Sequence, residues 1–91
     1  MSKRILIVED EESIADLEKD YLELSGFEVE VANDGQTGLD KALFGDFDLV
    51  ILDVMMENVS GYQVLQTMRA WGDHTPVMML SGKSDEMDQV L

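Results

Sequence analysis

Short apolar runs alternate with helix-periodic segments along the 91 residues of the chain. The runs at 4–8, 48–52 and 77–80 are almost purely apolar, which is typical of strands covered on both faces. The segment 27–31 instead alternates strictly between apolar and acidic residues. It is predicted to be a half-exposed strand at the edge of a sheet.

Helix signals fill the segments between these strands. In 13–25 apolar residues recur at spacings of three, four and three, which places them on one helical face. These residues are Ile14, Leu17, Tyr21 and Leu24. Gly26 is predicted to end this helix as its C′ residue. A turn and N-cap at 33–35 then lead into a second helix over 36–44.

Two more helices are predicted after the strand at 48–52. Residues 60–63 have the Ser-x-x-Gln form of a capping box, and the helix that they open is predicted to run to about Trp71. Residues 84–86 have the composition of a cap and first turn, so a fourth helix is predicted to continue to Leu91. Three strand–helix units followed by a strand and a started helix predict one α/β domain over 1–91, with a parallel sheet and right-handed crossovers.

Composition narrows the classes of function. Twenty acidic against six basic residues give a net charge of −14, which disfavours direct binding to nucleic acid or anionic membranes and favours cations and basic protein surfaces. The absence of cysteine excludes disulfides, thiolate metal sites and a cysteine nucleophile. No apolar run reaches the ~18 residues needed to cross a bilayer, so we expect a soluble, cytoplasmic protein with no membrane partner.

Acidic residues follow two of the predicted buried strands. Glu9 and Asp10 follow the first strand, and Asp53 ends the third. If these strands are neighbours, the three carboxylates converge where an open parallel sheet binds ligands. An all-oxygen set of this kind suits a hard divalent cation, and Mg²⁺ fits best. A carboxylate so placed can also act as the nucleophile that accepts a phosphoryl group.

Other residues near the strand ends have simpler or supporting roles. Ser81 and Gly82 follow the fourth strand, where a hydroxyl and a bare backbone amide could hold an oxyanion beside the metal. Glu11 and Glu12 are more simply explained as acids at a strand-to-helix turn.

Three motifs in the right order and spacing resemble the receiver domain of bacterial two-component response regulators, and most closely receivers attached to winged-helix DNA-binding domains. The motifs are Ile-Leu-Ile-Val-Glu-Asp-Glu at 5–11, Leu-Asp-Val-Met-Met at 52–56 with Gly61 beyond, and Met-Leu-Ser-Gly-Lys at 79–83. The resemblance covers the whole chain. It implies a flavodoxin-like, doubly wound parallel sheet with the strand order 2-1-3-4.

The resemblance also implies roles for the site residues. Asp53 would accept the phosphoryl group from a sensor histidine kinase or a small acyl phosphate. Glu9, Asp10, Asp53 and the backbone carbonyl of Met55 would hold Mg²⁺. The hydroxyl of Ser81 would move to bind the phosphoryl group, with the backbone amide of Gly82 beside it.

The sequence departs from the family at its end, because the fifth strand with its lysine and the last helix are missing. The chain is therefore predicted to be a truncated receiver domain, either a natural truncation or a fragment of a longer protein. Lys83 leaves from a different loop and is not assigned the role of the missing lysine. The outer edge of the strand at 77–80 would be unpaired, which predicts a homodimer or higher oligomer through that edge.

Three functions compete on this evidence. The first is a phosphoacceptor receiver switched at Asp53. The second is a phosphohydrolase with an aspartyl-phosphate intermediate, but Met55 stands where such enzymes have an acid, so an enzyme is not expected. The third is a truncated receiver fold that acts as a non-catalytic self-associating or adaptor module. The sequence leaves the kinase, the output and the lifetime of the phosphoryl group open.

Overall fold

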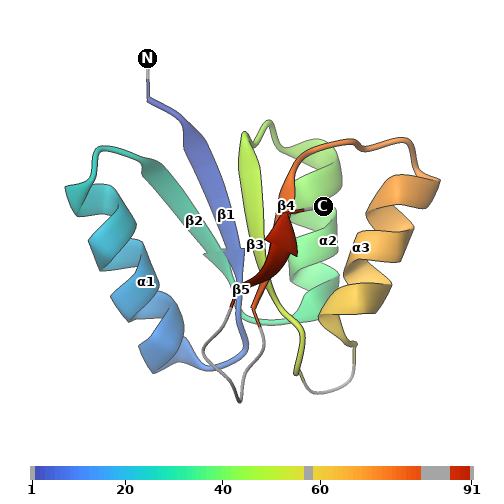
Figure 1. The fold of residues 1–91 in the computed structure, drawn as a ribbon, viewed down its shortest axis with the longest axis horizontal. Helices are drawn as coiled ribbons and strands as arrows, with labels where there is room; N and C mark the ends of the chain where they lie inside the picture. The colour runs from blue at the N-terminus through green and yellow to red at the C-terminus, as the bar shows by residue number, and fades with distance from the viewer. Residues whose placement is uncertain (1, 57–58, 81–86, 91) are drawn as a thin grey trace.

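In the computed structural model, which describes residues 2–56, 59–80 and 87–90, strands and helices follow one another in the predicted order as far as residue 80 (Figure 1). The elements are β1 (Arg4–Val8), α1 (Glu12–Leu24), β2 (Glu28–Ala32), α2 (Gly35–Phe44), β3 (Leu49–Asp53), α3 (Gly61–Ala70), β4 (Val77–Leu80) and β5 (Met87–Val90). No helix of the described residues is both long and apolar enough to cross a membrane.

The sheet has the order β2-β1-β3-β4-β5. β1, β2, β3 and β4 are mutually parallel, and this part confirms the predicted order 2-1-3-4. β2 lies at one edge, as its alternating sequence predicted. The chain leaves β1 in one direction toward β2 and returns on the other side with β3, so the strand order reverses between β1 and β3. The carboxyl ends of these two strands are therefore the expected place for a ligand.

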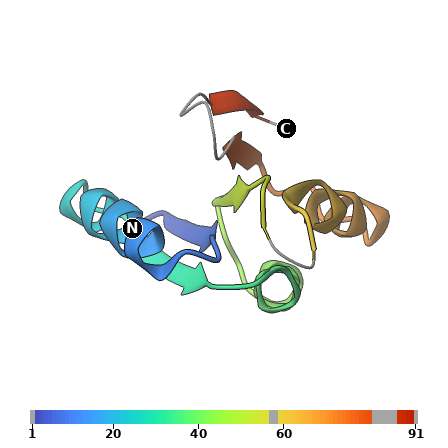
Figure 2. The ribbon, with the colours of Figure 1, turned by 90° about the horizontal axis from the view of Figure 1, so that it is seen from below.

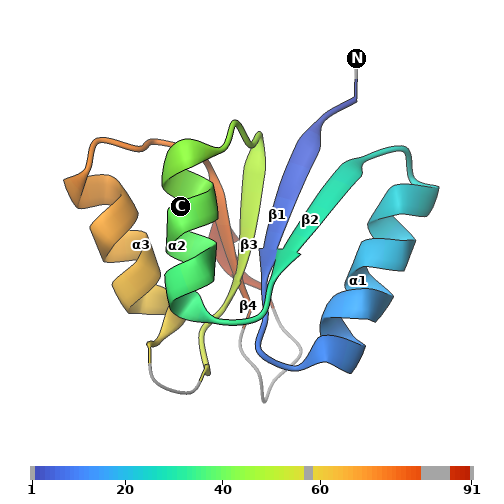
Figure 3. The same ribbon diagram turned by 180° about the vertical axis from the view of Figure 1, so that it is seen from behind.

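Helices cover the two faces of the sheet unequally. α2 and α3 lie on one face and α1 lies on the other (Figures 2 and 3). Successive residues of a strand point to opposite faces, so β1 contributes Leu6 and Val8 to the larger core beneath α2 and α3, and Ile5 and Ile7 to the smaller core beneath α1. All four side chains are buried. This explains the unbroken apolar run of a strand covered on both sides.

Local signals fix the helix ends as predicted. Asp34 caps α2 by accepting a hydrogen bond from the Thr37 amide at 2.7 Å. Ser60 and Gln63 form the expected capping box of α3, with each side chain accepting from the backbone amide of the other residue. Gly26 follows α1 with φ +98°, a left-handed conformation that favours glycine.

The prediction of a helix from 84–86 to Leu91 was wrong for the part that the structure describes. Residues Met87–Val90 form β5, which pairs antiparallel with β4. An isolated helix of about two turns is marginal in water, because few hydrogen bonds offset the cost of nucleation. The edge of β4 offers the same residues unpaired backbone groups, and pairing there satisfies both strands.

The pairing of β5 also removes the premise of the predicted oligomer, which itself stays a prediction. Self-association was expected because the outer edge of β4 would be open and apolar. That edge is instead occupied by β5, with Met78 opposite Val90, Leu80 opposite Met87 and a register shift between the two pairs. The fourth-strand edge is therefore not the free template on which the predicted homodimer depended.

The apolar stripe of α1 has an unexpected position. Ile14, Leu17, Tyr21 and Leu24 do share a face, but their exposed fractions are 42%, 71%, 72% and 89%. The residue that α1 buries completely is Ala15, and Leu22 is half-buried against the same core. The helix therefore has a small apolar face on the sheet and a second, larger apolar face that no described residue covers.

Candidate metal centre

Strand register brings two acidic residues to the same level of the sheet. β1 and β3 are paired with Val8 opposite Leu52, so the next residues along these strands are Glu9 and Asp53. Both side chains are buried at the carboxyl edge, with exposed fractions of 7% for Glu9 and 8% for Asp53. The fold thus places two carboxylates side by side where water is largely excluded.

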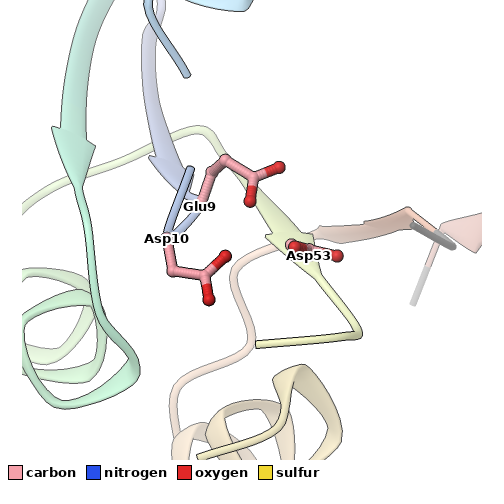
Figure 4. Close-up of side chains that lie close together, drawn as sticks. All are labelled: Glu9, Asp10 and Asp53. Carbon is pink, nitrogen blue, oxygen red and sulfur yellow. The ribbon is translucent and has the colours of Figure 1, made fainter. Parts of the chain in front are cut away.

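Asp10 completes an acidic cluster, which is defined here as Glu9, Asp10 and Asp53. One carboxylate oxygen from each of the three residues lies within 4.8 Å of the other two. Figure 4 shows the three side chains gathered around the ends of β1 and β3. The prediction that these carboxylates converge is confirmed.

Backbone groups hold the acidic cluster in place. The amide of Met55 donates a hydrogen bond to Asp53 Oδ1 at 3.0 Å, and the amide of Glu11 donates to Glu9 Oε2 at 3.3 Å. Asn33 Nδ2 donates to the backbone oxygen of Glu9 at 3.0 Å, which ties the loop after β2 to the end of β1. Two of the three carboxylates therefore have an orientation set by the turn that follows their own strand.

Gly61 lets α3 begin directly against the acidic cluster. Its amide donates to the backbone oxygen of Val54 at 3.2 Å. A Cβ atom at Gly61 would lie 2.5 Å from the backbone oxygen of Asp53, which is closer than real Cβ atoms come. This position therefore requires glycine because of space.

Electrostatic repulsion within the cluster is strong. Burial, together with the neighbouring Asp53 and Asp10 carboxyl groups, raises the pKa of Glu9 to about 8. Without a cation, the cluster therefore favours a proton on Glu9. Among the described residues, Arg4 and Lys41 form ion pairs with Glu30 and not with the cluster.

The acidic cluster fits Mg²⁺ by the chemistry of its donors. All three donors are carboxylate oxygens, and the structure brings no His or Cys into this group. A hard cation prefers such oxygens, and Mg²⁺ commonly takes a few carboxylates while it keeps several waters. A cation would also offset the charge that raises the pKa of Glu9. Glu9, Asp10 and Asp53 are the residues that would hold it.

The structure describes only one of the three remaining predicted site residues. Met55 lies in the loop directly after β3, with its amide bound to Asp53. Ser81 and Gly82 lie outside the described residues, and so does Lys83.

Two further residues were not predicted from the sequence. Asn33 holds the backbone of Glu9. Glu18 on α1 has a buried Oε1 atom with no hydrogen-bond partner among the described residues.

Comparison with known proteins identifies the class of protein. The sequence model of the response regulator receiver domain matches residues 5–90. The alkaline phosphatase synthesis transcriptional regulatory protein PhoP of Bacillus subtilis is 43% identical over 91 residues, which is 100% of this chain and 38% of PhoP. The chain belongs to the response regulator receiver domain family, and it spans less than two fifths of the length of this relative.

Solved structures confirm the flavodoxin-like fold. Response regulator protein TrrA of Thermotoga maritima, in complex with Mg²⁺ and BeF, has a TM-score of 0.84 and 38% identity over 90% of this chain and 71% of its own. The structure of histidine kinase ThkA in complex with TrrA gives a TM-score of 0.84 and 36% identity, over 96% of this chain and 75% of the matched chain. The resemblance to receivers and the predicted fold class are both confirmed.

Proposed function

We propose that the chain is a phosphoacceptor receiver in which Asp53 takes a phosphoryl group from a histidine kinase. The observation that carries this proposal is the acidic cluster, with Asp53 at the end of β3 and two further carboxylates within 4.8 Å. A carboxylate at the rim of a buried strand combines a fixed position with access from the loop side. The identity of the family supports the same function.

The Asp53 carboxylate is the nucleophile in the proposed reaction. One of its oxygens attacks the phosphorus of a phosphohistidine, the P–N bond breaks, and the electron pair of that bond returns to the imidazole. The product is an aspartyl phosphate. The Met55 amide, at 3.0 Å from Oδ1, limits rotation of the carboxylate before the reaction, which lowers the entropic cost of alignment.

Glu9, Asp10 and Asp53 would bind Mg²⁺, with the Met55 backbone carbonyl as a further ligand. When bound, the ion would supply positive charge that offsets the negative charge of the phosphoryl oxygens. Ser81 and Gly82 remain the proposed contacts of the phosphoryl group after transfer.

The partner proposed for this site is a sensor histidine kinase in the cytoplasm. TrrA, a similar response regulator, has been solved in complex with the histidine kinase ThkA. PhoP, a similar protein in sequence, is a transcriptional regulator, but this chain covers only 38% of it. With a net charge of −14, residues 1–91 are proposed to carry the switch without binding DNA themselves.

We also propose that the chain is not a turnover enzyme. A phosphohydrolase that works through an aspartyl phosphate needs a proton donor for the leaving group. Met55 occupies the position two residues after Asp53, and a thioether cannot donate a proton. Asp53 would therefore be phosphorylated once per signal.

Intact-mass spectrometry tests this function. The protein is incubated with Mg²⁺ and acetyl phosphate, and we expect one phosphoryl adduct in the wild type and none in Asp53→Asn. Asp40→Asn is the matched control, because Asp40 is an acid on α2 whose carboxylate accepts a hydrogen bond from Gln36 of the same helix. This control should be phosphorylated like the wild type.

Three other outcomes would reject the proposal. An adduct that survives in Asp53→Asn would place the acceptor elsewhere. A wild type that binds Mg²⁺ but gains no adduct would instead favour the adaptor function. Release of product from a phosphate ester at many turnovers would revive the hydrolase.

A further inference from the structure

A pocket lies at the end of the sheet opposite the acidic cluster, where the chain enters β3 and β4. α2 and α3 lie side by side, and the loops that follow them are at this same end of the molecule (Figures 1 and 3). The pocket has a volume of about 410 Å³ and is lined by the last residues of α2, the end of α3 and these two loops. The proposed phosphorylation of Asp53 makes no use of it.

Two large aromatic side chains of this pocket face solvent. Phe44, the last residue of α2, has an exposed fraction of 85%, and Trp71, the C-cap of α3, has one of 72%. Neither is part of the two hydrophobic cores, whereas Phe47 of the same pocket is buried in the larger core. The fold therefore leaves two aromatic rings at one pocket available for contact with a partner.

The charged side chains that line the pocket are both acidic. They are Asp46 and Asp73, and no basic residue lines the pocket in the part of the chain that the structure describes. Thr75 orients Asp73, because Oδ1 accepts from the Thr75 amide at 2.9 Å and from the Thr75 hydroxyl at 2.6 Å. The last carbonyls of α2 add partial negative charge. The pocket therefore favours a cation.

The basic side chains closest along the chain bind other groups. Arg69 donates to the backbone oxygens of Asp73 and Thr75, both at 2.8 Å. Lys41, in the last turn of α2, pairs with Glu30. These two cations offset part of the charge at the helix ends, but the two carboxylates of the pocket form no ion pair with the described residues.

Arg4 shows which kind of cation fits this loop. Its Cζ atom lies 4.7 Å from the centroid of the Phe47 ring, and its Nη1 donates to the backbone oxygen of Asp46 at 3.1 Å. A planar guanidinium can stack on a ring and donate from its edge at the same time, which a compact ammonium cannot do. Phe44 and Trp71 offer further aromatic surface of this kind in the pocket. The pocket therefore suits arginine better than lysine.

We propose that this pocket binds an arginine side chain of a separate protein, with the guanidinium against the rings of Phe44 and Trp71 and its charge toward the two aspartates. A pocket for a small molecule buries most of the ligand surface, and rings as exposed as these do not enclose one. The net charge of −14 attracts basic protein surfaces and disfavours a second copy of the chain. The binding does not involve Asp53, so it stands or falls separately from the proposed function.

Fluorescence of Trp71 tests the binding directly, because it is the only tryptophan of the chain. The probe is an uncharged-end peptide of three repeats of Gly-Ser-Arg, and the matched peptide has lysine in place of each arginine and therefore the same charge. We expect the arginine peptide to change the emission of Trp71 and to bind about threefold more tightly than the lysine peptide.

Variants of the exposed rings test the proposed contacts, with affinity measured by the anisotropy of labelled peptides. We expect Phe44→Leu and Trp71→Leu each to lose about threefold in affinity for the arginine peptide. The double variant should lose about tenfold and bind the two peptides equally. Both rings are exposed, so the urea midpoint of unfolding should stay close to that of the wild type.

A variant of Asp73 tests the contribution of charge. Asp73→Asn keeps an oxygen that can accept from Thr75 but removes the charge, so both peptides should bind more weakly. Asp20→Asn is the matched control, because Asp20 is an exposed acid of α1 outside the pocket. It should bind both peptides like the wild type.

Three results would overturn the proposal. Equal affinity of the wild type for the two peptides, or equal losses in Asp73→Asn and Asp20→Asn, would reduce the binding to general acidity. An arginine peptide that binds without changing the emission of Trp71 would have its site elsewhere. Protection of Trp71 from acrylamide quenching in the protein without peptide would show that the pocket is already covered by this chain or by a second copy.

Discussion

Gly61 is the residue on which the approach of α3 to the acidic cluster depends most directly. A methyl group at this position would lie 2.5 Å from the backbone oxygen of Asp53. We expect Gly61→Ala to lower the free energy of unfolding by about 1–3 kcal/mol, as overpacking usually does. Because the clash involves the backbone of Asp53, we also expect slower phosphorylation by acetyl phosphate, followed by intact mass.

Gly72→Ala is the control that separates a general loss of stability from a local effect on Asp53. Gly72 has φ +82° and open space around its Cα, so alanine there costs about 1 kcal/mol of backbone strain without a clash. This variant should lose stability but keep the wild-type rate of phosphorylation. Equal rates in Gly61→Ala and wild type would show that the contact does not position Asp53.

Glu30 provides a prediction about pH. Lys41, at 3.0 Å, and Arg4, at 2.5 Å, lower the pKa of this carboxyl below its ordinary value of 4.5. A lowered pKa stabilises the folded state above the ordinary value, and this gain is lost as pH falls through the lowered pKa. We expect Glu30→Gln to cost a few tenths to about 1 kcal/mol at pH 7, since the side chain is partly exposed, and less at pH 3, where the carboxyl begins to be protonated.

Urea unfolding at both pH values measures this difference. Glu28→Gln is a suitable control, because Glu28 is an exposed acid on the same strand that forms no ion pair with the described residues. It should change stability little at either pH. If Glu30→Gln instead lowers the free energy of unfolding as much at pH 3 as at pH 7, then packing rather than charge accounts for the contribution of Glu30.

The convergence of the acidic residues at strand ends could be predicted from the sequence, whereas the burial of Glu18 on α1 could not. Asp53, Glu9 and Asp10 interrupt or follow apolar runs, and parallel strands end at the same edge, so their convergence follows from sequence and topology. Glu18 has no such mark, because an acid is ordinary on an exposed helix. Only the packing of Ala15 and Leu22 on the sheet shows that the neighbouring position is partly buried.

At the scale of elements, β5 is the segment whose role can be tested most sharply. Proline fixes φ and removes an amide donor, so it disrupts a paired strand. Asp88 and Gln89 lie between the two paired residues of β5, where the register shifts, so Asp88→Pro and Gln89→Pro each fix φ and remove an amide inside the paired segment. We expect faster hydrogen exchange of the β4 amides in at least one of these variants, and a rise in apparent mass with concentration.

Gln89→Thr is the control for this test. Threonine keeps the amide and has a high strand propensity, so protection of β4 should be retained. If both proline variants show wild-type exchange and remain monomeric, β5 does not protect the edge of β4.

The secondary structure of the long periodic segments was predicted well from the sequence, and that of the short segment 87–90 was not. β1 and β4 have the predicted bounds, and the helices begin and end within a residue or so of theirs. For 87–90 the local residues favour a helix, yet the free edge of β4 decides the outcome. Such an edge exists only after the other strands have paired, so it cannot be read from a window of sequence.

At the scale of the whole molecule, the excess of acidic residues makes the stability of the folded state depend on cations. The net charge is −14, and three carboxylates of the acidic cluster lie within 4.8 Å of one another. Self-repulsion of this kind opposes the compact state, and any ion that binds only the folded chain offsets it. General screening by salt and specific binding at the cluster are two different effects, and they respond differently to mutation.

Removal of Mg²⁺ with a chelator should therefore lower Tm. At about 100 times its Kd, a ligand that binds only the folded state adds about 2.7 kcal/mol, and each kcal/mol is worth about 4–8 °C in a domain of this size. We expect Asp10→Asn to lose most of the Mg²⁺-dependent rise, measured by calorimetry. Without Mg²⁺ this variant should melt above the wild type, because one of three mutually repelling carboxylates is gone.

NaCl at matched ionic strength separates screening from binding. Screening depends on total charge, so NaCl should raise Tm to a similar extent in wild type and Asp10→Asn. The additional rise with Mg²⁺ should belong to the wild type alone. If Asp10→Asn instead keeps the full response to Mg²⁺, the ion acts on the chain only as a counterion, and the acidic cluster does not bind it.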